Sequence, residues 1–287
     1  MNDQRIAVLT DSGTDTPQEF VREHDVRVAA LHINYSDGSS YHSGVDITSE
    51  DVIRRFEDEI PKTSLPSPQE IFDLCEKAKA DGYVAGVFVT ISSALSATNQ
   101  TVHMIKGQLE DFPLVVIDTK SIGLIAGMIV MEAARLVEAG CVLDEIEGKL
   151  QALSSQSSVY FAVKDLTYLR KGGRISEAVF RLGTMLNIKP VMYCDKDGAY
   201  AVIKKARGWE KALATQVKLI KEQAQKFSKV RIGICTSSPS INMSELEERI
   251  RLEAPNVKEV IKATLSPDLL VHTGPDMVGM GVVPAED

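Results

Sequence analysis

Short apolar runs alternate with helix-forming segments through the first half of the chain, and this alternation most constrains its fold. The apolar runs cover residues 6–10, 26–35, 84–90 and 114–118. Helical patterns begin near residues 17, 49, 68, 96 and 121, and loops are expected at 37–44 and 61–68. Strands that alternate with helices form a parallel sheet with helices on both faces. The first half therefore predicts an N-terminal Rossmann-like α/β domain.

The second half contains a hairpin signal. Two strand-like segments flank Asp195-Lys-Asp-Gly198, and Asp-Gly supplies the positive φ that tight hairpin turns need. The segments expected here are strands 191–194, 199–203, 230–236 and 257–264 and helices 209–227 and 245–252. This order favours a C-terminal α/β domain with a mixed or antiparallel sheet. The polar segment 154–158 places the boundary so that the domains are residues 1–157 and 158–287.

Charge and composition exclude several classes of protein. The chain carries 32 Lys and Arg against 40 Asp and Glu, a formal net charge of −8, so its field repels phosphate and no nucleic-acid partner is expected. The most membrane-like segment, 121–131, is shorter than the roughly 20 residues of a span. The first residues lack the apolar segment of a signal peptide. The four cysteines form no Cys-x-x-Cys pair, which is typical of reduced thiols in a cytoplasmic protein.

Hydroxyl side chains gather where apolar runs end. They cluster at 10–14, at 63–67 and at 90–98. The carboxyl ends of parallel strands form a ligand crevice, and hydroxyls there can bind an anion, although each group can also simply cap the following helix. The loop Asp11-Ser-Gly-Thr-Asp15 has Gly13 where a phosphatase loop has its second acid, so a phosphoaspartyl mechanism is poorly supported. No GxGxxG, Walker A or Gly-x-Ser-x-Gly motif occurs.

Two further segments could contact an anion. The loop 169–176 holds three cations and two glycines, which can present guanidinium and backbone amides to a ligand or form a solvated turn. His272, beside a Gly-Pro turn, is the best placed histidine, with a purely structural role as its alternative. The remaining histidines have no ligand-like spacing, so no metal site is expected: His24, His32, His42 and His103.

Taken together, seven motifs resemble those of the DegV family, the bacterial fatty-acid-binding proteins (FakB type) that serve a fatty acid kinase. They are Asp11-Ser-Gly-Thr-Asp15, Thr63-Ser-Leu-Pro-Ser-Pro68, Ile91-Ser-Ser-Ala-Leu-Ser-Ala-Thr98, Asp118-Thr-Lys-Ser121, Leu169-Arg-Lys-Gly-Gly-Arg-Ile-Ser176, Lys189-Pro190 and His272-Thr-Gly-Pro275. The resemblance covers essentially the full length. It implies one long-chain fatty acid bound between the two domains. Ala94 and Ala97 stand where the family usually has Gly, so chain-length preference does not carry over.

The resemblance also implies particular site residues. Thr63 and Ser93 match the residues that hold the fatty acid carboxylate, His272 lies nearby, and Arg170 lies beside the head group. Further residues are expected at the pocket mouth: Ser64, Ser92, Ser96, Thr98, Thr273 and Gly274. No cofactor is expected besides the bound fatty acid.

The implied role is that of a non-catalytic carrier. A separate ATP-dependent fatty acid kinase subunit would phosphorylate the presented carboxylate, and Arg207 is the expected contact for that subunit. A transient membrane contact for ligand exchange is compatible with this role. Two alternatives stay open: an acyl or phosphoryl hydrolase with Ser93 as nucleophile and His272 as base, and a regulator whose surface changes on ligand binding.

Overall fold

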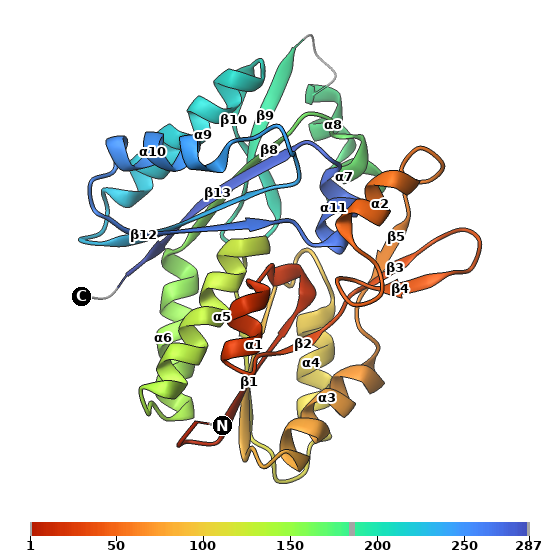
Figure 1. Cartoon of the computed structure of the whole chain (residues 1–287), viewed down its shortest axis with the longest axis vertical. Coiled ribbons are helices and arrows are strands. Elements are labelled where there is room, and N and C mark those ends of the chain that lie inside the picture. The colour runs from red at the N-terminus through yellow and green to blue at the C-terminus, as the bar shows by residue number, and fades with distance from the viewer. Residues whose placement is uncertain (1, 184–186, 286–287) are drawn as a thin grey trace.

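The computed structural model describes residues 2–183 and 187–285, which form a parallel sheet, a mixed sheet and one small sheet (Figure 1). The parallel sheet has four strands in the order β2-β1-β6-β7. Their bounds are β1 Ile6–Asp11, β2 Arg27–Ala29, β6 Ala85–Thr90 and β7 Leu114–Asp118. Every residue of β1 and β6 is buried, as expected for central strands covered on both faces.

Helices cover both faces of this sheet. One face packs against α3 (Pro68–Ala80) and α4 (Thr98–Lys106), and the other packs against α5 (Gly123–Glu138), with α6 (Leu143–Gln156) beside it. Ser67 and Glu70 form a capping box at the start of α3, which fixes where that helix begins. The short helices η1 (Ser12–Thr14) and α1 (Gln18–Glu23) follow β1.

The mixed sheet has six strands in the order β10-β9-β8-β13-β11-β12, of which only β11 and β12 pair in parallel. Their bounds are β8 Ser158–Val163, β9 Ile188–Cys194, β10 Tyr200–Arg207, β11 Val230–Thr236, β12 Val257–Thr264 and β13 Met277–Pro284. Its outer face carries α9 (Trp209–Ala224) and α10 (Met243–Glu253). The predicted fold class, with a parallel sheet first and a mixed sheet second, is confirmed.

Helix α5 packs between the two sheets (Figure 1). It contacts β1 and β6 on one side and β11 and β13 on the other, and one hydrophobic cluster runs through both. Gly127 lets α5 approach the loop after β1 closely, because a Cβ there would lie 2.4 Å from the Thr14 carbonyl oxygen. Since both sheets share α5, the division into domains at residue 157, between α6 and β8, stays a prediction.

A small antiparallel sheet lies beside the larger ones and was not predicted. It has the order β4-β3-β5, with β3 His32–Asn34, β4 Ser40–His42 and β5 Lys62–Ser64. The expected single strand 26–35 is therefore wrong: it breaks at residues 30–31 into β2, which pairs with β1, and β3, which joins the small sheet. The expected loops 37–44 and 61–68 contain β4 and β5, which have no apolar alternation to reveal them.

The remaining helices are α2 (Ser49–Arg55), α7 (Thr167–Lys171), α8 (Glu177–Gly183) and α11 (Pro267–Thr273). Helix α11 packs against α2, α7 and the small sheet. All four cysteines are free thiols, two buried and two half-buried. Among the residues described, no helix combines the length and the apolar character needed to cross a bilayer.

Candidate functional site

A largely apolar pocket lies between the two larger sheets. The empty space within its walls, including the part open to solvent, is about 670 Å³. Both halves of the chain supply apolar walls: Leu31, Ile91, Leu95, Ile122, Val159, Phe161, Leu265, Leu269 and Met277. The polar lining residues are few: Asp15, Thr63, Ser96, Arg174, Tyr200, Asp268, His272 and Thr273. The pocket suits an apolar ligand with a small polar group.

Thr63 and His272 meet in the pocket wall from opposite ends of the chain. Thr63 lies in β5, where it pairs with Ile33 of β3, and His272 lies near the end of α11. The Thr63 Oγ1 and His272 Nε2 atoms are 2.7 Å apart, which is a hydrogen bond. The structure therefore brings together two of the residues expected at the site.

The His272 imidazole is neutral at neutral pH. Burial, with a smaller effect of the Arg174 charge, lowers the pKa of His272 to about 3. Its Nδ1 atom is buried and has no hydrogen-bond partner among the described residues. The ring packs tightly on Gly172, where a Cβ would lie 2.1 Å from Nδ1. Gly172 therefore leaves the space in which the ring can direct Nε2 at Thr63, and any larger residue there would displace the ring.

Arg174 is the cation at the pocket, and Arg170 is not. Arg170 Nε lies 2.9 Å from the Glu177 carboxylate, and its guanidinium stacks over Phe180. Arg174 lines the pocket, and its Nη2 donates to the Leu95 carbonyl at 3.0 Å. Both arginines lie in the expected basic loop, but the chain turns after α7 so that only the second faces the pocket. Arg170 does not line the pocket, and its expected position beside a fatty acid head group stays a prediction.

Five residues line both the pocket and an outer hollow, and we call these residues the neck. The hollow has an empty volume of about 770 Å³. The neck residues are Leu31, Thr63, Leu95, Ser96 and Arg174. The hollow is also lined by expected residues of the site and by the two alanines that replace family glycines: Ser64, Ser93, Ala94 and Ala97. Polar groups thus gather at the neck, while the interior is mostly apolar.

The other expected hydroxyls have different partners. Ser93 Oγ donates to the Asp118 carboxylate at 2.6 Å, so its proton is not directed at the pocket. Ser92 is buried and donates to the Gly198 carbonyl at 2.9 Å, which attaches β6 to the β9–β10 hairpin. Ser96 Oγ lies 2.9 Å from Thr98 Oγ1, and of these two only Ser96 lines the pocket.

The residues of the motif His272-Thr-Gly-Pro275 also have different roles. Thr273 lines the pocket and donates to the Leu269 carbonyl at 3.1 Å. Gly274 ends α11 with φ of 73°, a conformation that favours glycine, and it packs against the Tyr168 ring instead of lining the pocket. Gly274 therefore shapes the end of the helix that carries His272.

Three buried carboxyls interact with one another, two of them in the pocket wall, and none was predicted as a site residue. Burial, opposed by a hydrogen bond from the Ile91 N–H, raises the pKa of Asp11 to about 7. Burial and the nearby Asp268 raise the pKa of Asp15 to about 8, and burial also raises the pKa of Asp268. Ser12 and Ser266 donate to Asp268, while Asp15 Oδ2 has no partner among the described residues. Asp15 and Asp268 thus add proton-dependent groups to the wall.

The parallel sheet, the mixed sheet and the pocket between them define the class: an α/β protein that encloses a largely apolar site between two sheets. Residues 5–285 match a family described as "Uncharacterised protein, DegV family". The chain belongs to the DegV family, as its motifs predicted.

Relatives agree with this assignment. The chain is 34% identical over 278 residues to a DegV domain-containing protein of Clostridium acetobutylicum, covering 96% of this chain and 98% of that one. It is 29% identical, with a TM-score of 0.90, to a DegV family protein from Thermus thermophilus whose structure is described as fatty acid binding, covering 98% of this chain and 100% of that one. A stearic acid-binding protein from Eubacterium ventriosum, 24% identical over 97% of this chain and 98% of its own, shares the fold with a TM-score of 0.84.

Proposed function

We propose that this protein binds a single long-chain fatty acid in the pocket between the sheets and presents its carboxylate to a separate ATP-dependent fatty acid kinase. The observation that carries the proposal is the hydrogen bond between His272, in the wall of a largely apolar pocket, and Thr63 at its neck. A relative that is 29% identical over almost the whole chain, and is described as binding fatty acid, supports the same ligand class.

The energetics of an apolar pocket favour a long acyl chain. Each buried methylene contributes about 0.8 kcal/mol, so about fourteen of them contribute roughly 11 kcal/mol before the cost of binding. The carboxylate must find donors, because burying it unpaired costs several kcal/mol. The polar groups at the neck meet this need while leaving the carboxylate next to the outer hollow.

The neutral imidazole sets the direction of the Thr63 hydroxyl. When His272 carries its proton on Nε2, that proton is donated to Thr63 Oγ1, and the hydroxyl proton is free for an acceptor in the pocket. Arg174 adds a positive charge to the neck without a bidentate grip on the ligand, since its guanidinium already donates to the Leu95 and Gly172 carbonyls. A carboxylate oxygen held in this way stays available to accept a phosphoryl group.

Ser93 remains our proposed second donor. To donate to a ligand, the Ser93 hydroxyl must turn away from the Asp118 carboxylate, which accepts its hydrogen bond in the structure. A carboxylate so close to the position of the ligand head group repels it, so Thr63 carries more of the proposed binding than Ser93 does.

The geometry does not favour a hydrolase that uses Ser93 and His272. His272 bonds to Thr63 instead of Ser93, and no carboxylate orients its Nδ1 among the described residues. A histidine with a pKa of about 3 is also a weak base at neutral pH. A nucleophile and base must lie within hydrogen-bond reach, and these two have separate partners.

The direct test is to identify the molecule that the protein carries from cells. Protein purified without detergent is analysed by native mass spectrometry and then extracted into organic solvent. We expect one free fatty acid per chain. Protein that is empty and refuses added fatty acid, or that hydrolyses acyl esters, would contradict the proposal.

Removing the Thr63 hydroxyl should weaken binding. We expect Thr63→Ala to cost about 1 to 3 kcal/mol of fatty acid affinity, since the carboxylate loses one donor, and Thr63→Ser to restore most of it. Thr215→Ala, which removes an exposed hydroxyl on α9, is the matched control. Titration with a fluorescent fatty acid measures the affinity of the wild type and of the three variants. Equal affinity of the wild type and Thr63→Ala would reject the assignment.

Arg207 provides a test of the kinase contact. It lies exposed at the end of β10, opposite Ile188 and outside the pocket lining. We expect Arg207→Ala to leave fatty acid affinity unchanged but to slow acyl phosphate formation with an added kinase. The defect should be smaller at high salt, because charges at the rim of an interface mainly change the association rate and salt screens them. Lys106→Ala on α4 is the control. Wild-type turnover at every salt concentration would show that Arg207 is not part of the contact.

A further inference from the structure

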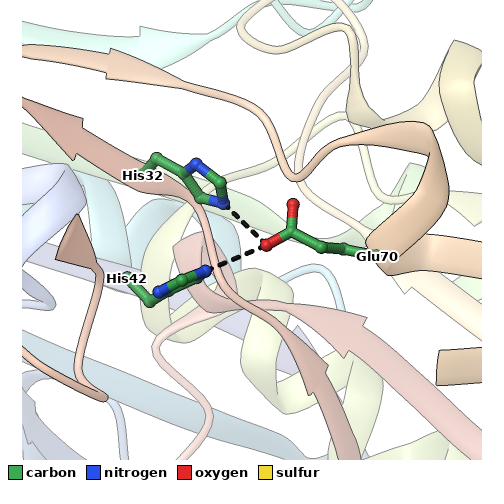
Figure 2. Close-up of side chains that lie close together, drawn as sticks. All are labelled: His32, His42 and Glu70. Carbon is green, nitrogen blue, oxygen red and sulfur yellow. Dashed lines mark hydrogen bonds and ion pairs between the residues drawn. The ribbon is translucent and has the colours of Figure 1, made fainter. Parts of the chain in front are cut away.

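Two histidines and a glutamate meet on the small sheet, outside the pocket lining (Figure 2). His32 on β3 and His42 on β4 are direct partners in the antiparallel register. Glu70 reaches them from the first turn of α3. Glu70 Oε1 lies 3.0 Å from His32 Nε2 and 2.9 Å from His42 Nε2, so both rings direct the same nitrogen at one carboxylate oxygen.

Neighbouring groups hold two of these side chains in place. His42 Nδ1 lies 3.0 Å from Asp46 Oδ2, the arrangement in which a carboxylate orients a histidine whose other nitrogen binds a metal. The Ser67 N–H donates to Glu70 Oε2 at 2.7 Å, which leaves Oε1 for the two histidines. Neighbouring hydrogen bonds therefore orient the His42 and Glu70 side chains that would bind a metal ion.

We infer that His32, His42 and Glu70 bind one divalent transition-metal ion, of which zinc fits best. Two imidazole nitrogens and one carboxylate oxygen are a known three-residue zinc ligand set, with a fourth position left for water or another ligand. The three ligand atoms lie within 4.8 Å of one another. Small rotations of the side chains bring them to the roughly 2.0–2.2 Å bonds that zinc forms.

The ion would strengthen the connection between the paired strands β3 and β4 and the start of α3. His32 is also the register partner of Ser64, the neighbour of Thr63 on β5. Bound metal would therefore stiffen the strand that carries Thr63, although metal binding itself does not depend on a fatty acid ligand.

The test uses full-length protein without a histidine tag, stripped with a chelator and dialysed. Calorimetric titration with Zn²⁺ should give one site per chain, and Co²⁺ should give the visible absorption of a four-coordinate site with nitrogen and oxygen ligands. His32→Gln and His42→Gln should each abolish the stoichiometric site. His103→Gln, which changes an exposed histidine on α4, should bind as the wild type does.

A second variant separates binding from folding. Asp46→Asn leaves all three ligands in place and should weaken zinc affinity about 10- to 100-fold by loosening the His42 ring. Circular dichroism checks that each variant keeps the wild-type fold. No binding by the wild type, or equal binding by His32→Gln and His103→Gln, would overturn the inference.

Discussion

Gly127→Ala is expected to destabilise the protein by about 3 kcal/mol, at the upper end of what overpacking costs. The added methyl would lie 2.4 Å from the Thr14 carbonyl oxygen and 3.0 Å from the Thr16 nitrogen. Both are backbone atoms, so the clash cannot be relieved by turning a side chain. Either α5 or the loop after β1 must move, and that loop carries Asp15 of the pocket wall. Denaturation monitored by circular dichroism measures the change.

Gly148→Ala is the matched control, because it also replaces a helical glycine. Nothing lies within 4 Å of a Cβ at Gly148, which is exposed on α6. Here alanine should stabilise the protein by about 0.4 to 1 kcal/mol through its better helix propensity. If the two substitutions changed stability in the same direction, close packing of α5 would not be the cause.

The free energy of unfolding should fall as the pH rises from about 6.5 to 8. In the unfolded chain, aspartate ionises near pH 4, whereas the pKa values of Asp11 and Asp15 in the folded chain are about 7 and 8. Between those values the folded protein keeps protons that the unfolded chain has released, and stability declines with pH. For Asp15 alone, at about 1.4 kcal/mol per pH unit, the loss is about 2 kcal/mol over this range.

His272 has the opposite effect at lower pH. Its pKa is about 3 in the folded protein but near 6.5 in the unfolded chain, so below pH 6.5 only the unfolded chain binds the proton. Stability from this residue therefore rises between about pH 3 and 6.5 and offsets one of the two aspartates, so the net decline below pH 6.5 is about half of what the aspartates alone would give. Above pH 6.5 the aspartates act without this opposing effect, so that range tests them most directly.

Chemical denaturation at a series of pH values measures both effects. Asp15→Asn should reduce the decline above pH 6.5 to the part due to Asp11, and His272→Gln should steepen the fall in stability between about pH 4 and 6.5. Asp73→Asn, at an exposed acid on α3, should leave the profile unchanged. Wild-type stability that increased between pH 6.5 and 8 would show that these carboxyls are ionised in the folded protein.

Periodic patterns predicted the larger elements, whereas contacts between distant residues could not be predicted. The apolar run of β6 and the Asp-Gly turn between β9 and β10 have local causes. Strands of three residues, such as β5, are too short to show alternation, so the sheet that carries Thr63 was missed. His32 and His42 are ten residues apart but lie opposite each other across two strands, which spacing along the chain does not reveal.

Within the site, several of the segments named by the motifs line the pocket, but not always through the side chains that the motifs indicated. The basic loop reaches the pocket, but a left-handed turn at Gly173, with φ of 72°, decides that Arg174 faces it and Arg170 does not. Asp268 and Asp15 both line the pocket although they are some 250 residues apart in the sequence, and no local sequence pattern predicts such a pair. The choice between neighbouring residues of one type depends on backbone geometry, which composition and spacing do not determine.

The position of α5 between the sheets limits how a ligand can enter or leave. Thirteen of its 16 residues are buried, and both sheets pack on it. A hinge motion that swung one half of the molecule away from the other would expose much of this helix to water and cost the free energy of its burial. Opening the molecule between its two halves is therefore costly, whereas a small displacement of the neck residues would expose far less apolar surface.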